Sequence, residues 1–339
     1  MDEKRRIELD NLLIKKYSQL ERQKKVGTMG NFNPGDIPVL YATGRGLAEA
    51  WENSTIALWN EGIDIRTQYD QKNSDGEYIS PPSKDCTMSM VITEPNSEPK
   101  IHKCFPGGYN NLEEYRQEVV DGIKNHWVRD PNNPDDNRWE YTYNERLENY
   151  TVPGLEEAIN QFEEMAQKLA QNYITRRANM ITWKPWEDNT ISDPPCLQSL
   201  WGRIFRNEQG NPKLNLNIRF RSRDDYKAAF MNAFGFIDYG NKLADRISEL
   251  SGEEVSLGRF VDQSDSFHIY GKDFIDFYNV FANSLEKRTF FSEDDLNSRA
   301  CCSDSPEIKY FFDMAKKEVP KKIAKYDKEK AERKEKGVI

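Results

Sequence analysis

Two consecutive runs with strand character, joined by a short polar connection, constrain the fold of this chain most strongly. In residues 213–222, KLNLNIRFRS, leucine, isoleucine and phenylalanine alternate with asparagine and arginine, so one strand face belongs to a core and the other meets something polar. The run 196–205, CLQSLWGRIF, precedes it across NEQGNP, a connection typical of a hairpin. Helical and strand-like runs intermix elsewhere without a strict βαβ alternation. The pattern predicts an α+β layered fold, with a mixed sheet flanked by helices.

Helical periodicity predicts helices in the first two dozen residues, from residue 47 to a stop at Gly62, and over 112–127 and 224–250. A helix is also predicted over 154–173, where one face carries Leu155, Ile159, Phe162, Met165, Leu169 and Tyr173. The segment 129–138 is interpreted as a polar, proline-broken loop. We expect an N-terminal helical extension at 1–30, a catalytic domain at 31–290, and a charged, mainly helical extension at 291–339.

Composition narrows the class of protein. The chain has 339 residues with a formal net charge of −9, which argues against a nucleic-acid partner. Its five cysteines show no CxxC spacing and only three histidines accompany them, so neither a metal site nor a disulfide framework is expected. No run is as long and apolar as a membrane span, and the first residues are charged. We therefore expect a cytoplasmic protein with no membrane partner.

Short motifs follow one another in a fixed order. Upstream stand YTYNERL, AINQF and the pair Arg176-Arg177; then come DPPCL with Cys196, FRSRD, MNAF and HIY. The set resembles thymidylate synthase and its relatives, the pyrimidine nucleotide hydroxymethylases, in which the corresponding motifs are Tyr-Gly-x-x-Trp-Arg, Ile-Asp-Gln, Pro-Cys, Gln-Arg-Ser-x-Asp, Phe-Asn and His-x-Tyr. The resemblance covers roughly residues 41–270, and the ordered set is highly specific although each motif alone is weak. It implies a thymidylate synthase-like fold and a homodimer formed across the sheet.

The resemblance gives Cys196 a chemical role. Carbon 5 of a uracil ring is not nucleophilic enough to attack a one-carbon donor, so an enzyme first adds a thiolate at carbon 6. Cys196 would be that thiolate, with Arg221 lowering its pKa and 5,10-methylenetetrahydrofolate as co-substrate. Tyr143, in YTYNERL, would be the active-site tyrosine.

Arginine forks match phosphate oxygens two at a time. By resemblance, Arg221 and Ser222 would hold the nucleotide phosphate from their own subunit. Arg176 and Arg177 would reach into the partner's site, which makes the protein a homodimer. The alternative for this pair is an exposed helix C-terminus, where cations offset the helix dipole.

The nucleotide itself would be recognised by three further side chains. The amide of Asn232 can pair with O4 and N3–H of uracil, which favours dUMP over a cytosine nucleotide. His268 and Tyr270, alternate residues of an extended segment, match family residues that hydrogen-bond the sugar 3′ hydroxyl.

Two carboxylates complete the predicted site. Asp224 matches the aspartate that binds the folate pterin, and it also fits a helix N-cap. Glu52 is the candidate for the family's catalytic glutamate, one helical turn earlier than in the family, with a solvated surface glutamate as the alternative.

Three departures bear on the product. Leu197 follows the cysteine where thymidylate synthases have histidine, no Arg-Thr-Gly loop is recognisable although Arg45 or Arg66 could replace it, and the apolar C-terminal tail is missing. A site that admits water hydroxymethylates rather than methylates, so hydroxymethyl-dUMP is slightly favoured over dTMP. The alternatives are a thymidylate synthase proper, a (d)CMP hydroxymethylase, and a nucleotide-binding regulatory protein without turnover. A cysteine hydrolase would need a histidine base, and no histidine pairs with Cys196 by motif.

Overall fold

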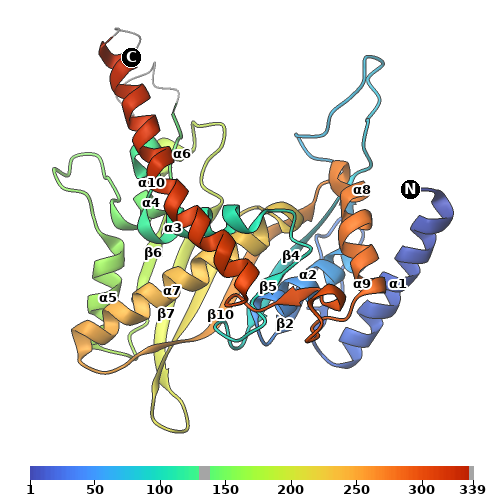
Figure 1. The fold of residues 1–339 in the computed structure, drawn as a ribbon, viewed down its shortest axis with the longest axis horizontal. Coiled ribbons are helices and arrows are strands. Elements are labelled where there is room, and N and C mark those ends of the chain that lie inside the picture. Colours follow the sequence, from blue (N-terminus) through green and yellow to red (C-terminus); the bar gives the residue numbers. More distant parts are fainter. Residues whose placement is uncertain (130–137, 336–339) are drawn as a thin grey trace. The chain divides into compact units, whose positions relative to one another are not determined.

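The computed structural model describes residues 1–129 and 138–335, and it divides into two compact units. The first unit contains Met1–Pro106, Leu216–Ala233 and Gly258–Ser303, and the second contains Gly107–Asn215, Phe234–Leu257 and the residues from Asp304 onward. In Figure 1 the ribbon is coloured along the sequence, from blue at the N-terminus to red at the C-terminus. The loop predicted at 129–138 lies almost entirely outside the described residues.

The first unit is built on a mixed sheet. Its strand order is β1-β2-β4-β10-β8, with β3 beside β4 and β9 beside β10. β2 and β4 are parallel, whereas β4 and β10 are antiparallel. The strands are β1 (Val26–Thr28), β2 (Val39–Gly44), β3 (Ile63–Ile65), β4 (Ser83–Ile92), β8 (Pro212–Phe220), β9 (Arg223–Asp224) and β10 (Ser256–Ile269).

Helices cover this sheet. The helix α2 (Leu47–Glu61) is buried along nearly its whole length, and α1 (Glu3–Arg22) packs on it through Leu9, Leu13 and Tyr17. The unit also holds α8 (Phe274–Phe277), α9 (Asn283–Lys287), π-helical turns at Asp225–Ala229 and Tyr278–Ala282, 3₁₀ turns at Gly271–Asp273 and Asp295–Asn297, and a small antiparallel ladder of β5 (Ile101–His102) with β11 (Ala300–Cys301). The helix predicted at the N-terminus is confirmed, as is the stop at Gly62.

The second unit contains the predicted hairpin. β7 (Leu197–Arg206) leads into β8, whose residues up to Asn215 belong to this unit and the rest to the first, and β6 (Asn179–Ile181) pairs antiparallel with β7. Its helices are α3 (Tyr109–Asp121), α4 (Tyr143–Glu148), α5 (Gln161–Gln171), α6 (Pro185–Asp188), α7 (Phe230–Ser251, whose first residues belong to the first unit) and α10 (Pro306–Glu335), with a 3₁₀ turn at Asn125–Trp127. The predicted α+β class, with a mixed sheet flanked by helices, is confirmed.

Two predicted helices have different bounds. The helix predicted over 154–173 begins only at Gln161, because Asn160 caps it by accepting a hydrogen bond from the Glu163 N–H at 2.9 Å. Leu155, predicted on the buried face, lies outside the helix and is 56% exposed. The helix predicted over 112–127 ends at Asp121, since Gly122 adopts a left-handed conformation with φ of 66° that terminates it.

Within residues 1–129 and 138–335, no helix has the length and apolar character needed to cross a membrane.

Candidate active site

Cys196 lies half-buried at the end of the loop that precedes β7. Two tyrosines lie near it, Tyr143 at the start of α4 and Tyr141 just before that helix, and their rings are 5.5 Å apart. Burial raises the pKa of Tyr143 well above its usual value, and the nearby Tyr141, Tyr115 and Cys196 raise it further. The structure thus places Tyr143 near Cys196.

Tyr141 is a further neighbour of Cys196, which was not among the predicted site residues. Burial raises the pKa of Tyr141, and charge on the Cys196 sulfur raises it further, while a hydrogen bond with the Cys196 backbone opposes both effects. Spacing could have found this residue. In the family motif Tyr-Gly-x-x-Trp-Arg the arginine comes five positions after the tyrosine, and counting back from Arg146 gives Tyr141 rather than Tyr143.

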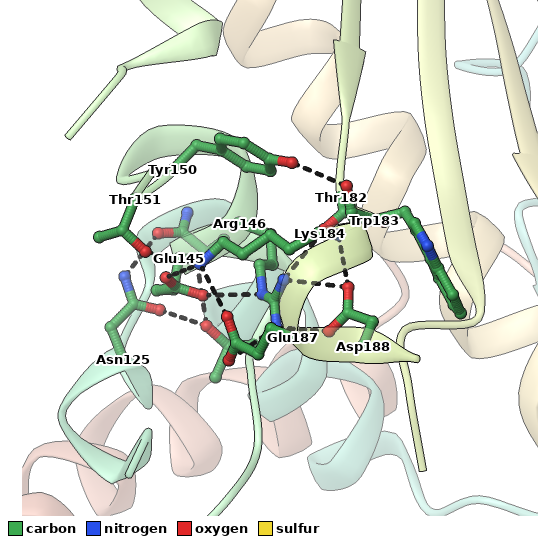
Figure 2. Close-up of polar contacts among 12 residues, drawn as sticks. Asn125, Glu145, Arg146, Tyr150, Thr151, Thr182, Trp183, Lys184, Glu187 and Asp188 are labelled. Carbon is green, nitrogen blue, oxygen red and sulfur yellow. Dashed lines mark hydrogen bonds and ion pairs between the residues drawn. The ribbon is translucent and has the colours of Figure 1, made fainter. Parts of the chain in front are cut away.

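A buried ionic cluster fixes the start of the loop that carries Cys196 (Figure 2). Arg146, on α4, is fully buried. Its guanidinium binds both carboxylate oxygens of Asp188, at 3.1 and 2.9 Å, and donates to the carbonyl of Thr182 at 3.2 Å. Asp188 also accepts a hydrogen bond from the backbone N–H of Lys184 at 2.6 Å. This bidentate pair therefore ties α4 to the segment immediately before the loop.

The remaining members of the cluster surround Lys184. Its ammonium group donates to the Thr151 hydroxyl at 2.8 Å and lies 3.4 Å from a Glu145 carboxylate oxygen. Burial raises the pKa of Glu145, and Lys184 and Arg146 oppose that effect. The Tyr150 hydroxyl donates to the carbonyl of Trp183 at 2.7 Å. Figure 2 shows these side chains converging from α4, its flanking residues and the 182–188 segment.

The far end of the loop is held by strand pairing. The Thr182 hydroxyl donates to the carbonyl of Leu197, and the Thr182 N–H donates to the carbonyl of Gln198 at 3.1 Å. The Gln198 side chain in turn donates to the carbonyl of Pro195 at 2.9 Å. Because both ends of the loop 189–196 are held, the backbone at Cys196 has a defined position.

Arg176 and Arg177 lie in the turn between α5 and β6, and both side chains are exposed. Neither guanidinium forms a hydrogen bond or an ion pair with a residue that the structure describes. α5 ends at Gln171, too far from these cations for them to offset its dipole. The alternative explanation as a helix C-terminus is therefore wrong.

In the first unit, His268 and Tyr270 lie at the end of β10 with ring centroids 4.6 Å apart. His268 is 5% exposed, and burial lowers its pKa to about 4, against the effect of a hydrogen bond to the Ser266 backbone. The backbone turns sharply after Tyr270. A Cβ atom at Gly271 would lie 1.9 Å from the carbonyl oxygen of Pro81, so only glycine fits there.

Asp224 caps the helical segment that follows β9: its carboxylate accepts a hydrogen bond from the Lys227 N–H at 2.9 Å. The predicted N-cap is confirmed. Burial raises the pKa of Asp224 to about 6, and the charge of Asp273 also raises it. In the sheet register Asp224 pairs with His268.

The other predicted nucleotide ligands of this unit are close in sequence to Asp224. Arg221 and Ser222 are half-buried between β8 and β9, and Asn232 is buried on α7. The intervening Arg223 is buried, where it pairs with Asp262 and donates to the carbonyl of Ala229 at 2.8 Å. Arg223 is therefore part of the core, and it is not the arginine of FRSRD that was predicted to bind the phosphate.

Glu52 is buried on α2 and is not a solvated glutamate, so that alternative is wrong. Arg299 binds its two carboxylate oxygens at 2.7 and 2.8 Å, and a ring nitrogen of His102 lies 2.9 Å from one of them. Burial raises the pKa of Glu52, but hydrogen bonds from Arg299 and His102 prevail and lower it to about 2. Neither partner was found from the sequence, because no motif links Glu52 to residues 50 and 247 positions away.

Arg45 and Arg66, the two arginines that could replace the Arg-Thr-Gly loop, both contact other residues of the chain. Arg45 lies 2.8 Å from a Glu94 carboxylate oxygen, and Arg66 donates to the carbonyl of Ser80 at 2.8 Å and stacks on the Tyr78 ring. In the described ranges, no group of three or more His, Cys, Asp or Glu side chains is placed to hold a metal ion.

Comparison with known proteins identifies the family. No family model matches the chain. A protein named "Putative thymidylate synthase" from Methanocaldococcus jannaschii is 31% identical over 230 residues, covering 66% of this chain and 87% of the relative. This chain belongs to the thymidylate synthase-like superfamily.

A second relative of the superfamily, from Methanothermobacter thermautotrophicus and with the same name, is 31% identical over 245 residues, or 67% of this chain and 92% of the relative. Among solved structures, thermostable thymidylate synthase A from Bacillus subtilis is similar with a TM-score of 0.48 and 18% identity, over 72% of this chain and 86% of that one. The two curated relatives confirm the family resemblance carried by the motifs. The roles of the individual residues stay predictions.

Proposed function

We propose that this chain transfers a one-carbon unit from 5,10-methylenetetrahydrofolate to carbon 5 of dUMP. Cys196 adds to carbon 6 of the uracil ring, and carbon 5 becomes nucleophilic and attacks the donor methylene. Loss of the carbon 5 proton expels the folate nitrogen and leaves an exocyclic methylene group. Water adds to this methylene carbon to give the hydroxymethyl product, or hydride from tetrahydrofolate adds to give the methyl product, and elimination of the Cys196 thiolate releases the nucleotide. The position of Cys196, at the end of a loop held at both ends and beside Tyr141 and Tyr143, carries the proposal.

The remaining residues bind and orient. Arg221 and Ser222 hold the phosphate, with Arg176 and Arg177 contributed by a second subunit of a homodimer. Asn232 pairs with the uracil edge, and His268 and Tyr270 bind the sugar. Asp224 fits the folate pterin, because its carboxylate, although partly buried, can accept hydrogen bonds from the pterin N–H groups. Glu52 is held ionised by Arg299, so it orients water and accepts hydrogen bonds rather than donating a proton. The cytoplasm is the compartment we propose for this reaction.

We propose hydroxymethyl-dUMP as the product slightly ahead of dTMP. Methylation requires that water be kept from the methylene intermediate until hydride arrives. The segment Pro306–Glu335, where the family has an apolar closing tail, is a helix with mixed charged and apolar residues. It packs on α3, where Lys322 lies 2.9 Å from a Glu114 carboxylate oxygen and the Phe311 and Tyr109 rings are 5.7 Å apart. Because this helix packs on α3 and is not an apolar tail that closes over the folate, it supports a site that admits water.

Mass spectrometry of the product distinguishes the candidates. Purified protein is incubated with dUMP and 5,10-methylenetetrahydrofolate, and the expected product has gained a hydroxymethyl group while tetrahydrofolate is regenerated. A methyl gain with release of dihydrofolate would establish thymidylate synthase activity instead. Turnover of dCMP or CMP without turnover of dUMP would refute the role of Asn232. No turnover of any of them, with dUMP still bound, would favour a regulatory nucleotide-binding protein.

A further inference from the structure

A short polar chain leads from His268 into the core of the first unit. The Ser266 hydroxyl lies 3.2 Å from Nδ1 of His268 and donates its proton to Oδ2 of Asp85 at 2.8 Å. His268 and Asp85 face each other across the β10–β4 pair. The ladder is interrupted between Ser264 and Phe267 by a β-bulge, an irregularity that re-aims side chains and is frequent beside active sites.

The direction of each hydrogen bond fixes the proton on the histidine. Burial raises the pKa of Asp85 to about 6, so at pH 7.5 its carboxylate is ionised and only accepts hydrogen bonds, and the single proton of the Ser266 hydroxyl goes to Asp85. The oxygen of Ser266 then faces Nδ1 with a lone pair at 3.2 Å, and this contact is attractive only if Nδ1 carries a proton. Because neutral imidazole has one N–H, Nε2 is left with a lone pair. Burial disfavours the doubly protonated ring, whose pKa is lowered to about 4.

We propose that Asp85 and Ser266 are positioning residues that hold His268 in its Nδ1–H tautomer, so that Nε2 accepts a hydrogen bond and selects a ligand bearing a hydroxyl donor. The identity of that donor, the sugar 3′ hydroxyl of the nucleotide, rests on the proposed function. The tautomer does not, because it follows from contacts within this chain alone.

Nitrogen-15 NMR of the histidine rings tests the tautomer without any ligand. The chain has only three histidines, and His268→Gln identifies the signal of interest. At pH 7.5 the wild type is expected to show a pyrrole-like Nδ1 and a pyridine-like Nε2 for His268. The opposite pattern would overturn the proposal.

Two variants make the test directional. In Asp85→Asn the new amide can donate to the Ser266 oxygen, which frees the Ser266 proton for Nδ1, so the ring is expected to switch to the Nε2–H tautomer. Ser266→Ala removes the contact and should allow both tautomers. Ser264→Ala, on the same strand before the bulge, is the matched control and should leave the ring unchanged. If Asp85→Asn, shown to be folded by circular dichroism, keeps the wild-type tautomer of His268, then Asp85 and Ser266 do not set that tautomer.

Binding measurements then test the selected donor. Relative to wild type, folded Asp85→Asn is expected to bind dUMP about 10-fold more weakly, the loss of roughly one hydrogen bond, while its affinity for 2′,3′-dideoxyuridine monophosphate is unchanged. Equal weakening for both nucleotides would refute the selection of a hydroxyl by Nε2. If wild-type protein binds neither nucleotide, the proposed function fails, and the NMR result alone decides the tautomer.

Discussion

The ionic cluster before the Cys196 loop gives the most quantitative prediction. Asp188 is 1% exposed and is the bidentate partner of Arg146, which is completely buried. Replacing Asp188 with alanine leaves a buried guanidinium with only the Thr182 carbonyl and more distant carboxylates, at 3.4 Å, on Glu187 and Glu145. Removing one partner of a buried pair costs about 3–5 kcal/mol. We therefore expect Asp188→Ala to lower the free energy of unfolding by about 3 kcal/mol or more.

Urea denaturation followed by tryptophan fluorescence measures this change. The control is Glu163→Ala, which removes a similar bidentate contact to Arg246, at 2.9 Å for both hydrogen bonds, but at the surface. An exposed pair contributes roughly 0–1 kcal/mol, so the control should lose far less. Equal losses in the two variants would refute the argument that burial makes the Asp188 contact important.

A double variant separates the charge from the space it fills. Arg146→Met with Asp188→Leu removes both charges and keeps apolar volume, so it should be more stable than Asp188→Ala. If the cluster also positions the loop, this double variant should alkylate at Cys196 with iodoacetamide at an altered rate and lose kcat while it remains folded. An unchanged kcat in the folded double variant would mean that the cluster stabilises the unit without positioning Cys196.

Three further predictions concern other parts of the molecule. His268 has a folded pKa of about 4, below its ordinary value near 6.5, so its contribution to stability is complete above pH 6.5 and is lost as the pH falls toward 4. The free energy of unfolding of His268→Gln should lack this loss of about 3 kcal/mol. If wild type and variant lose the same free energy of unfolding between pH 6.5 and pH 4, this prediction is wrong. Arg299→Gln leaves the Glu52 carboxylate with His102 alone, and we expect kcat of the folded variant to fall at least 10-fold in the product assay. An unchanged kcat would show that Glu52 takes no part in the reaction. If Arg176 and Arg177 act in the partner's site, unfolding and refolding an equal mixture of Cys196→Ser and Arg176→Ala/Arg177→Ala should restore about a quarter of the wild-type sites, and no recovery would argue against sharing.

Local sequence patterns predicted the elements better than their bounds. The alternation in 213–222 gave β8 and its buried face correctly, because period-two burial is a local property. The helix predicted over 154–173 was too long, since an asparagine side chain at position 160 competes for the backbone N–H groups and starts the helix there. Apolar periodicity marks the buried face of a helix but does not locate its caps, which here are Asn160 and Gly122.

In the candidate site, too, local sequence patterns predicted some features, whereas contacts between distant segments were seen only in the structure. Motif order predicts a tyrosine of YTYNERL in the site, and only the distance to Arg146 distinguishes Tyr141, just before α4, from Tyr143, its first residue. The partners of Glu52 come from a two-stranded ladder, in which Ala300 pairs with His102. No local pattern predicts such a contact between distant segments, so the ionised state of Glu52 required the structure.

Tritium release from carbon 5 of labelled dUMP tests the central claim most directly. Wild-type protein with 5,10-methylenetetrahydrofolate should release tritium into water, whichever product forms, because carbon 5 must lose its proton after Cys196 has added to carbon 6. Cys196→Ser should bind dUMP with similar affinity and release none above background. Tritium release from the serine variant at the wild-type rate, or none from active wild-type protein, would contradict covalent catalysis by Cys196.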